Sequence, residues 1–181
     1  MGKNKTGEVK TRLLQTGEAI FSTQEVSATP VAQILTQAGI TRRTFYRYYA
    51  NKHELAADIV RPVFTESIIT LELMTDDNAA NIDRIIDIYI GLDEKRRDAL
   101  NLSSRLDPQL FALVADEHNA YVAALLKVLE RLSDLPLWRN PNPAYNLQLI
   151  ARTAIPILKI CREQPGYPAL YRATIRGMLL K

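Results

Sequence analysis

The sequence predicts an all-α fold in two parts, a small N-terminal helical bundle joined to a larger helical region. Apolar residues recur at three- and four-residue spacing along most of the 181 residues, and no run of alternating β-branched residues predicts a strand. Prolines and Asp/Asn clusters mark the loops. We expect one domain over residues 1–55 and a second over residues 56–181, and we expect the first core helix to run from Val9 to Phe21.

Two short helices and a glycine turn follow in the N-terminal part. Thr29 can cap the first of them with its hydroxyl, and Pro30 suits the first helical position. Gly39 stands where a helix end favours positive φ, and Thr41 can cap a second helix over residues 42–49. This is the helix-turn-helix pattern, in which the second helix enters the major groove of DNA.

The second of these helices carries two different faces. Phe45 and Tyr49 are four residues apart and can share a buried face, while the arginines and other tyrosines project elsewhere. Between Gly39 and Lys52 there are four basic residues and no acidic one, as a surface that faces phosphates requires. The alternative is a solvated basic face on an ordinary helix pair, but that alternative does not predict exposed tyrosines beside arginines.

These residue types predict particular DNA contacts. An arginine near the start of a recognition helix can form two hydrogen bonds with guanine, whereas Tyr46, Tyr48 and Lys52 are better placed for backbone oxygens. The predicted DNA-binding residues are Thr29, Thr41, Arg42, Arg43, Thr44, Tyr46, Arg47, Tyr48 and Lys52.

Residues 39–55, GITRRTFYRYYANKHEL, resemble the TetR family pattern: Gly, apolar, Ser or Thr, two variable residues, Thr, aromatic or Leu, Tyr, variable, His or Tyr, Phe or Tyr, two variable, Lys, two variable, Leu. The resemblance covers about residues 8–60. Arg43 departs from it, since members often have glycine or a small residue there, and residues 22–28 lack the usual glycine. The resemblance implies a TetR-like fold, with a three-helix DNA-binding domain, a linking helix and a C-terminal helical domain for ligand binding and dimerisation.

The same resemblance implies a sequence-specific transcriptional regulator. Its commonest form is a repressor that binds a palindromic operator on double-stranded DNA as a homodimer and is released by a small-molecule effector. In the family the last two helices commonly build the dimer interface, and the helices expected here over residues 144–163 and 167–180 carry apolar and small residues compatible with that role. The alternative is that these two helices only complete the core of the monomer.

The rest of the chain reads as helices. We expect a long helix from Asn51 to Met74 that kinks or restarts near Pro62, and a break over residues 75–78. A helix with an isoleucine stripe follows, then a short one over residues 95–103. Asp107 is expected to cap a helix over residues 108–132 whose wide apolar face, including Phe111, is core, and residues 135–143 form a proline-rich loop.

Charge supports a polyanion-binding N-terminal part. Residues 1–61 hold nine basic and five acidic residues, a net of +4, whereas the whole chain carries +3. The basic segment over residues 1–10 can add phosphate contacts as an arm or can be a disordered tail. It has no apolar core to follow, so it does not predict a signal peptide, and no apolar run predicts a membrane span.

Catalytic and metal functions are not expected. The sequence has no Gly-rich phosphate loop, no paired Cys motif and no His-Glu-x-x-His run, and its two histidines and one cysteine are scattered. We therefore expect no enzyme activity, no metal and no cofactor. The single cysteine excludes an intrachain disulfide and favours the reducing cytoplasm.

An effector pocket is predicted from polar-tipped and aromatic residues on apolar segments, which can orient a ligand but are also common core residues. These residues are Tyr89, His118, Tyr121, Trp138 and Cys161. An alternative function is a helical interaction protein or co-activator that uses a TetR-like head with a protein partner and no effector. A filled helical core would favour that alternative, whereas a cavity and stabilisation by a small molecule would favour the repressor.

Overall fold

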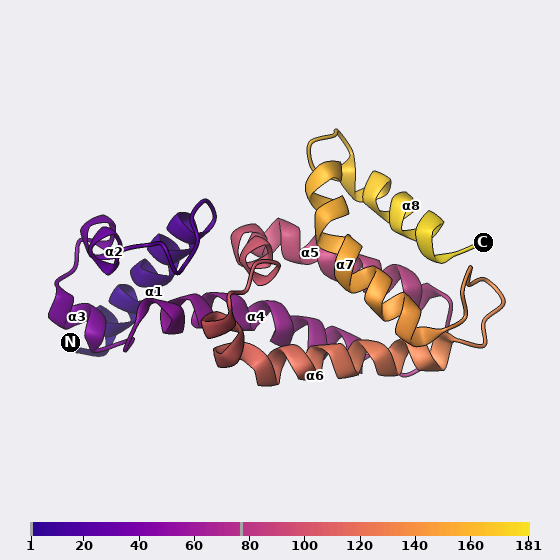
Figure 1. Ribbon diagram of the computed structural model, residues 1–181, viewed down its shortest axis with the longest axis horizontal. Coiled ribbons are helices and arrows are strands. Elements are labelled where there is room, and N and C mark those ends of the chain that lie inside the picture. The colour runs from indigo at the N-terminus through magenta and orange to yellow at the C-terminus, as the bar shows by residue number, and fades with distance from the viewer. Residues whose placement is uncertain (1, 77) are drawn as a thin grey trace. The chain divides into compact units, whose positions relative to one another are not determined.

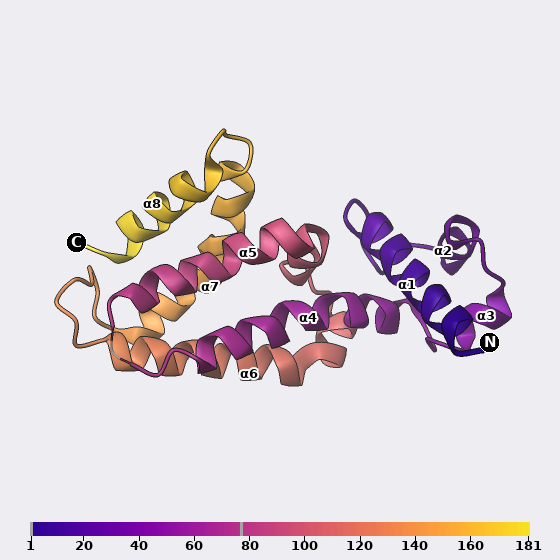
Figure 2. The ribbon, with the colours of Figure 1, turned by 180° about the vertical axis from the view of Figure 1, so that it is seen from behind.

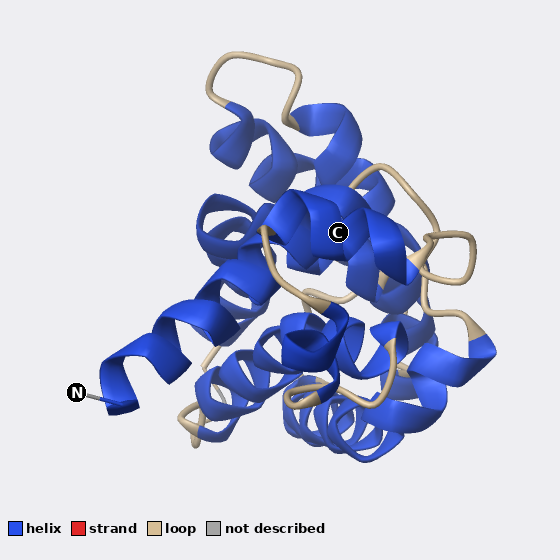
Figure 3. Ribbon diagram, turned by 90° about the vertical axis from the view of Figure 1, so that its left-hand side faces the viewer, coloured by secondary structure: helices blue, strands red, loops and turns tan. Residues whose placement is uncertain are grey.

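The computed structural model describes residues 2–76 and 78–181, with side chains described from residue 7 onward within those ranges. These residues form helices joined by loops (Figures 1 and 3). Within them the β pairing is confined to one isolated bridge between Trp138 and Leu180. The predicted all-α class is therefore confirmed. The helices are α1 Gly2–Phe21, α2 Val31–Ala38, α3 Arg42–Tyr46, α4 Lys52–Glu72, α5 Ala80–Ser103, α6 Pro108–Leu132, α7 Pro143–Cys161 and α8 Tyr167–Leu179.

The chain forms two compact units, and each contains parts of α4, α5 and α6. The first unit comprises the chain up to Val63 together with Asp98–Asp116, and the second comprises Phe64–Arg97 and Glu117–Lys181. The domain boundary expected after residue 55 stays a prediction, because compactness alone does not define a domain boundary.

The first unit is built around α1 and the start of α4. A side chain at Gly17 would place its Cβ 3.0 Å from both Ile59 Cδ1 and Leu55 Cδ2, so glycine allows the two helices to approach closely. Leu13 and Phe21 of α1 are fully buried in this core. The apolar stripe of α1 thus provides the platform on which α2 packs.

The second unit holds α7 and α8 in contact with each other (Figures 1 and 2). Its C-terminal end is tied to the loop before α7, since the Arg139 amide donates to the Leu179 carbonyl at 2.9 Å and the Lys181 amide to the Leu137 carbonyl at 2.8 Å. Trp138 is buried at this junction, and its indole nitrogen donates to the Leu132 carbonyl at 2.6 Å.

Several local expectations need correction. Pro30, not Thr29, is the N-cap residue of α2, and no side chain caps that helix. The helix α3 ends at Tyr46 rather than at residue 49, and the chain then turns through Tyr48. The helix α4 continues through Pro62 without a restart.

Two further expectations concern α5 and α6. The short helix expected over residues 95–103 is supported, because non-helical backbone angles at Arg96 (φ −145°, ψ 44°) divide α5 into two helical segments. Phe111 was expected in the core of α6 but is 39% exposed. The cap of α6 is confirmed, because the Leu110 amide donates to the Asp107 carboxylate at 2.8 Å. The break over residues 75–78 is confirmed between α4 and α5, although Asp77 lies outside the described residues.

Candidate nucleic-acid interface

The turn between α2 and α3 is built by one glycine and one threonine. Gly39 adopts the left-handed conformation (φ 61°, ψ 40°), and the Ile40 amide donates back to the Leu35 carbonyl at 3.1 Å. A side chain would be strained there, so glycine closes α2 at low cost. Thr41 then caps α3, since its hydroxyl oxygen accepts from the Thr44 amide at 3.2 Å. The predicted glycine turn and threonine cap are both confirmed.

The two faces predicted for α3 are also present. Phe45 is fully buried and Tyr49 is nearly so, with their ring centroids 6.0 Å apart. The Tyr49 hydroxyl donates to the Asp58 carboxylate of α4 at 3.2 Å. Burial, with a smaller effect of Asp58, raises the pKa of Tyr49 well above its ordinary value. The aromatic pair therefore fixes α3 against α4 as a neutral, hydrogen-bonded anchor.

The other face of α3 and the turn after it presents arginines and tyrosines to solvent. Arg42 lies over the Tyr46 ring, with its guanidinium carbon 5.6 Å from the ring centroid, and Arg47 lies over the Tyr48 ring at 5.5 Å. Such cation–π contacts favour particular side-chain positions without using the guanidinium hydrogen bonds. Arg42, Arg43 and Arg47 are exposed, and Tyr46 is 44% exposed.

Acidic groups are scarce around this face. The sequence has no Asp or Glu from residue 39 to residue 53. The first one after it, Glu54, accepts the Ala50 amide at 2.7 Å, while Asn51 accepts the Glu54 amide at 3.0 Å and caps α4. The exposed surface of α3 is thus positively charged. The next carboxylate along the sequence, that of Glu54, already accepts a backbone hydrogen bond.

Two of the predicted DNA-binding residues lie differently. Thr29 is fully buried, and its hydroxyl donates to the Glu25 carbonyl at 2.9 Å. Lys52 is half-buried at the start of α4, and its ammonium donates to the Thr29 carbonyl at 2.8 Å and also to the Ser27 carbonyl. The structure therefore brings Thr41, Arg42, Arg43, Thr44, Tyr46, Arg47 and Tyr48 together around α3, but it places Thr29 and Lys52 in the support behind them.

Contacts from the loop before α6 also support this unit, and the sequence patterns did not predict them. The His53 Nε2 lies 3.3 Å from the Asp107 carboxylate. The Arg105 guanidinium donates to the Phe21 carbonyl at 2.9 Å, at the end of α1. These pairs join residues more than 50 positions apart, and local sequence patterns carry no signal for them.

Comparison with known proteins identifies the unit. The family described as "Bacterial regulatory proteins, tetR family" matches residues 13–59, which span α1 from Leu13, the α2–turn–α3 segment and the start of α4. Residues 13–59 therefore match the N-terminal domain of TetR-family regulators. The match to a family of regulatory proteins supports the expectation that the chain is not an enzyme.

A curated relative and several solved structures resemble this chain. The HTH-type transcriptional repressor SCO4008 of Streptomyces coelicolor is 26% identical over 88 residues, which are 49% of this chain and 46% of that protein. The match therefore spans about half the length of the curated relative.

Two solved structures share the whole fold. NalD, the secondary repressor of the MexAB-OprM multidrug efflux pump in Pseudomonas aeruginosa, is 19% identical with a TM-score of 0.70, over 99% of both chains. The ketosteroid transcriptional regulator KstR2 of Mycobacterium tuberculosis is 19% identical with a TM-score of 0.72, over 100% of this chain and 97% of that one. At these identities the likeness shows the fold, and it confirms a TetR-like architecture.

The five residues predicted for an effector pocket occupy different settings in the second unit. The Tyr89 and Tyr121 hydroxyls are 2.6 Å apart, and Tyr121 and His118 both pack on the Phe64 ring, with centroid distances of 6.1 and 5.5 Å. Cys161 is buried at the end of α7. Trp138 lies in the junction with the C-terminal end, described above. The prediction that these residues line a pocket stays untested.

Polar groups missed by the sequence reading lie near the tyrosine pair. Asp93 is 1% exposed and pairs with Arg162, the C-cap residue of α7, at 2.8 Å. Burial, with smaller effects of Tyr121, Cys161 and Asp93, raises the pKa of Tyr171 far above its ordinary value. Burial likewise raises the pKa of Tyr89. The largely apolar core of the second unit therefore also contains a tyrosine hydroxyl pair and one buried ion pair.

The described residues include no group of three or more His, Cys, Asp or Glu side chains placed to hold a metal ion. Within the same ranges, no helix combines the length and the apolarity that crossing a bilayer requires.

Proposed function

We propose that this chain is a sequence-specific DNA-binding transcriptional repressor that acts as a homodimer in the cytoplasm. The exposed face of α3 carries the proposal: three arginines, two of them over tyrosine rings, follow a glycine turn that presents the helix to solvent. An arginine with its hydrogen-bond donors available can read guanine in the major groove, and the tyrosines beside it can bind phosphate oxygens. The TetR-family match over the same residues supports this reading.

A dimer is needed for specificity, because one helix-turn-helix contacts too few bases, whereas two related by a two-fold axis read a pseudo-palindrome about one helical turn apart. We propose that α7 and α8 form the interface. The α8 residues Leu170, Ala173 and Gly177 are exposed at helical spacing, and Ile160 of α7 is 71% exposed. Small and apolar residues on an exposed helix pair suit close packing against a second copy.

We further propose that a small-molecule effector binds the second unit and releases the repressor from its operator. In a dimer, the operator is bound only when the two α3 helices have the spacing that fits it. A ligand that binds more tightly to a different spacing lowers the population of the DNA-binding form and thereby lowers DNA affinity. The hydrogen-bonded hydroxyls of Tyr89 and Tyr121, inside an otherwise largely apolar core, support a site where a polar ligand could be oriented.

The test is fluorescence-anisotropy binding of the purified protein to the DNA upstream of its own gene and to random duplex, across a salt series. The repressor proposal expects tight, selective binding with two copies per site. Weak binding that is equal on both DNAs and vanishes with salt would contradict it and would direct attention to protein partners.

A further inference from the structure

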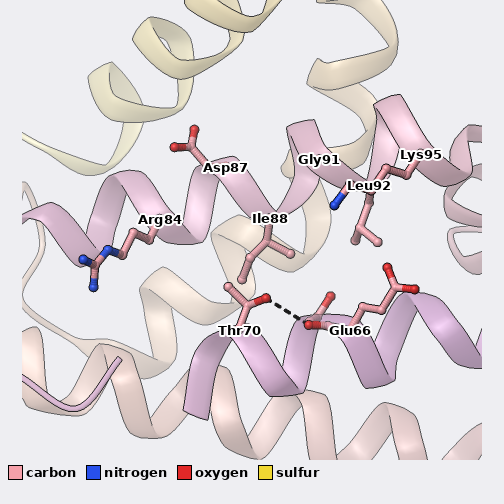
Figure 4. Close-up of a pocket in the computed structure, with 9 residues that line it drawn as sticks. Glu66, Thr70, Arg84, Asp87, Ile88, Gly91, Leu92 and Lys95 are labelled. Atoms are coloured by element: carbon pink, nitrogen blue, oxygen red, sulfur yellow. Dashed lines mark hydrogen bonds between the residues drawn. The ribbon is translucent and has the colours of Figure 1, made fainter. Parts of the chain in front are cut away.

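A groove lies between α4 and α5 in the second unit, and none of the five residues predicted for an effector pocket lines it (Figure 4). Its volume is about 240 Å³. Thr70 of α4 faces Ile88 and Leu92 of α5 across it, with Arg84 at one end and Lys95 at the other. Ile88 and Leu92 supply the aliphatic part of the lining. Arg84 and Lys95 stand at its two ends, and the remaining polar lining residues are Glu66, Ser67 and Asp87.

Gly91 creates the hollow on the α5 side. A Cβ built at this position meets no atom within 4 Å, and its φ is not positive, so neither packing nor backbone conformation requires glycine. Glycine inside a helix destabilises that helix relative to alanine. The structural consequence of Gly91 is therefore the open space beside Lys95, four residues further along the same face of α5.

The carboxylates of the lining are already neutralised by arginines from outside it. Glu66 accepts from Arg96 at 2.6 and 2.7 Å, and Asp87 accepts from Arg172 of α8 at 2.5 and 3.1 Å. A cationic ligand would therefore compete with formed ion pairs. The groove carries surplus positive charge, since Arg84 and Lys95 remain in the lining.

Lys95 is the better placed of these two cations. It is exposed and forms no ion pair with any residue of the described ranges, and its side chain extends back along α5 towards Gly91 (Figure 4). Arg84 donates to Asn81 at 3.1 Å and lies eleven residues away, about 16 Å along the helix axis. One short ligand therefore reaches one cation and not both.

We infer that this groove binds a small aliphatic carboxylate, with its head group on the Lys95 ammonium and its chain over Gly91, Ile88 and Leu92. One ammonium beside the paired Glu66 suits a single negative charge, and the named lining has no aromatic ring for a planar ligand. The volume equals about eight waters, which suits an organic ion of roughly ten non-hydrogen atoms. Binding of a carboxylate in this groove does not depend on the proposed repressor function. The role of the groove as the effector site does rest on that proposed function.

Isothermal titration calorimetry with octanoate on the full chain tests this inference. We expect saturable binding at one site per chain, and at least about tenfold weaker binding of octan-1-ol, because the alcohol loses the charge-assisted hydrogen bond. Lys95→Gln is expected to weaken octanoate binding by a similar factor, whereas Lys127→Gln, on an exposed α6 lysine outside the groove, is expected to change nothing. Gly91→Leu is expected to abolish binding while the melting temperature stays the same or rises.

No binding of octanoate, equal binding of octanoate and octan-1-ol, or unchanged binding by Lys95→Gln and Gly91→Leu would each overturn the inference. A DNA-binding assay with the same proteins separates this result from the proposed function. Octanoate binding without operator binding would contradict the repressor proposal and support the carboxylate site. Operator binding without octanoate binding would contradict the carboxylate site and support the repressor proposal.

Discussion

Replacing Lys52 with methionine separates two roles for its ammonium, support of the α1–α2 loop and contact with a DNA phosphate. The ammonium donates to the carbonyls of Ser27 and Thr29. A hydrogen bond from a charged donor contributes about 1.5–3 kcal/mol when shielded. Because Lys52 is half-buried and Ser27 is exposed, water can replace part of this interaction, and we expect Lys52→Met to lower the free energy of unfolding by about 1–2 kcal/mol. The melting temperature should fall by roughly 3–6 °C.

The assay that separates the roles is DNA affinity measured across a salt series beside thermal unfolding. Losing one phosphate contact lowers the slope of log affinity against log salt by about 0.9. We expect Lys52→Met to weaken binding to specific and random DNA alike with an unchanged slope. The matched control is Arg47→Met on the exposed face, which should lower the slope and leave the melting temperature unchanged. A lowered slope with an unchanged melting temperature for Lys52→Met would refute the supporting role and establish a phosphate contact.

Three other expectations concern bases, backbone and pH. Arg42→Ala should cost about 1–3 kcal/mol on the operator and relax base preference, and equal loss on random DNA would contradict base reading. Gly39→Ala should lower the free energy of unfolding by about 1 kcal/mol in urea titrations because of its positive φ, whereas Gly91→Ala should raise it by about 0.5–1 kcal/mol. Burial raises the pKa of Tyr49 and Tyr171 above the ordinary value of 10.0. Just above pH 10 these two tyrosines therefore ionise in the unfolded chain but not in the folded one, so the free energy of unfolding falls as pH rises. The tyrosinate absorbance of Tyr49 and Tyr171 should appear only as the helical circular dichroism signal is lost. Ionisation of all eight tyrosines while that signal remains would contradict the raised pKa values.

Much of the helix-turn-helix unit was predictable because its determinants are local. The left-handed Gly39, the Thr41 cap and the four-residue spacing of Phe45 and Tyr49 all act within one or two turns of chain. The length of α3 was not predictable in the same way. The helix ends at Tyr46, and the chain then turns and places Tyr49 against Asp58, a residue of another helix.

The roles of Thr29 and Lys52 show where local reading ends. Both residue types suit a cap or a phosphate contact, and nothing near them in the sequence indicates another partner. In the folded chain Lys52 meets carbonyls 23 and 25 residues away, and Thr29 becomes buried. A side chain with several hydrogen-bonding options takes the partner that tertiary packing brings within reach.

The sequence by itself determined the all-α class, the helix-turn-helix and the basic face of α3, because periodicity, capping and charge are properties of neighbouring residues. Only the tertiary structure decided which polar groups meet. Two polar contacts join residues far apart in the sequence: the Tyr89–Tyr121 pair and the buried Asp93–Arg162 pair. The groove beside Lys95 exists only because α4 and α5 pack side by side. The physical reason is that a hydrogen bond or ion pair needs atoms within about 3–4 Å, and chain separation in sequence says little about distance once helices pack.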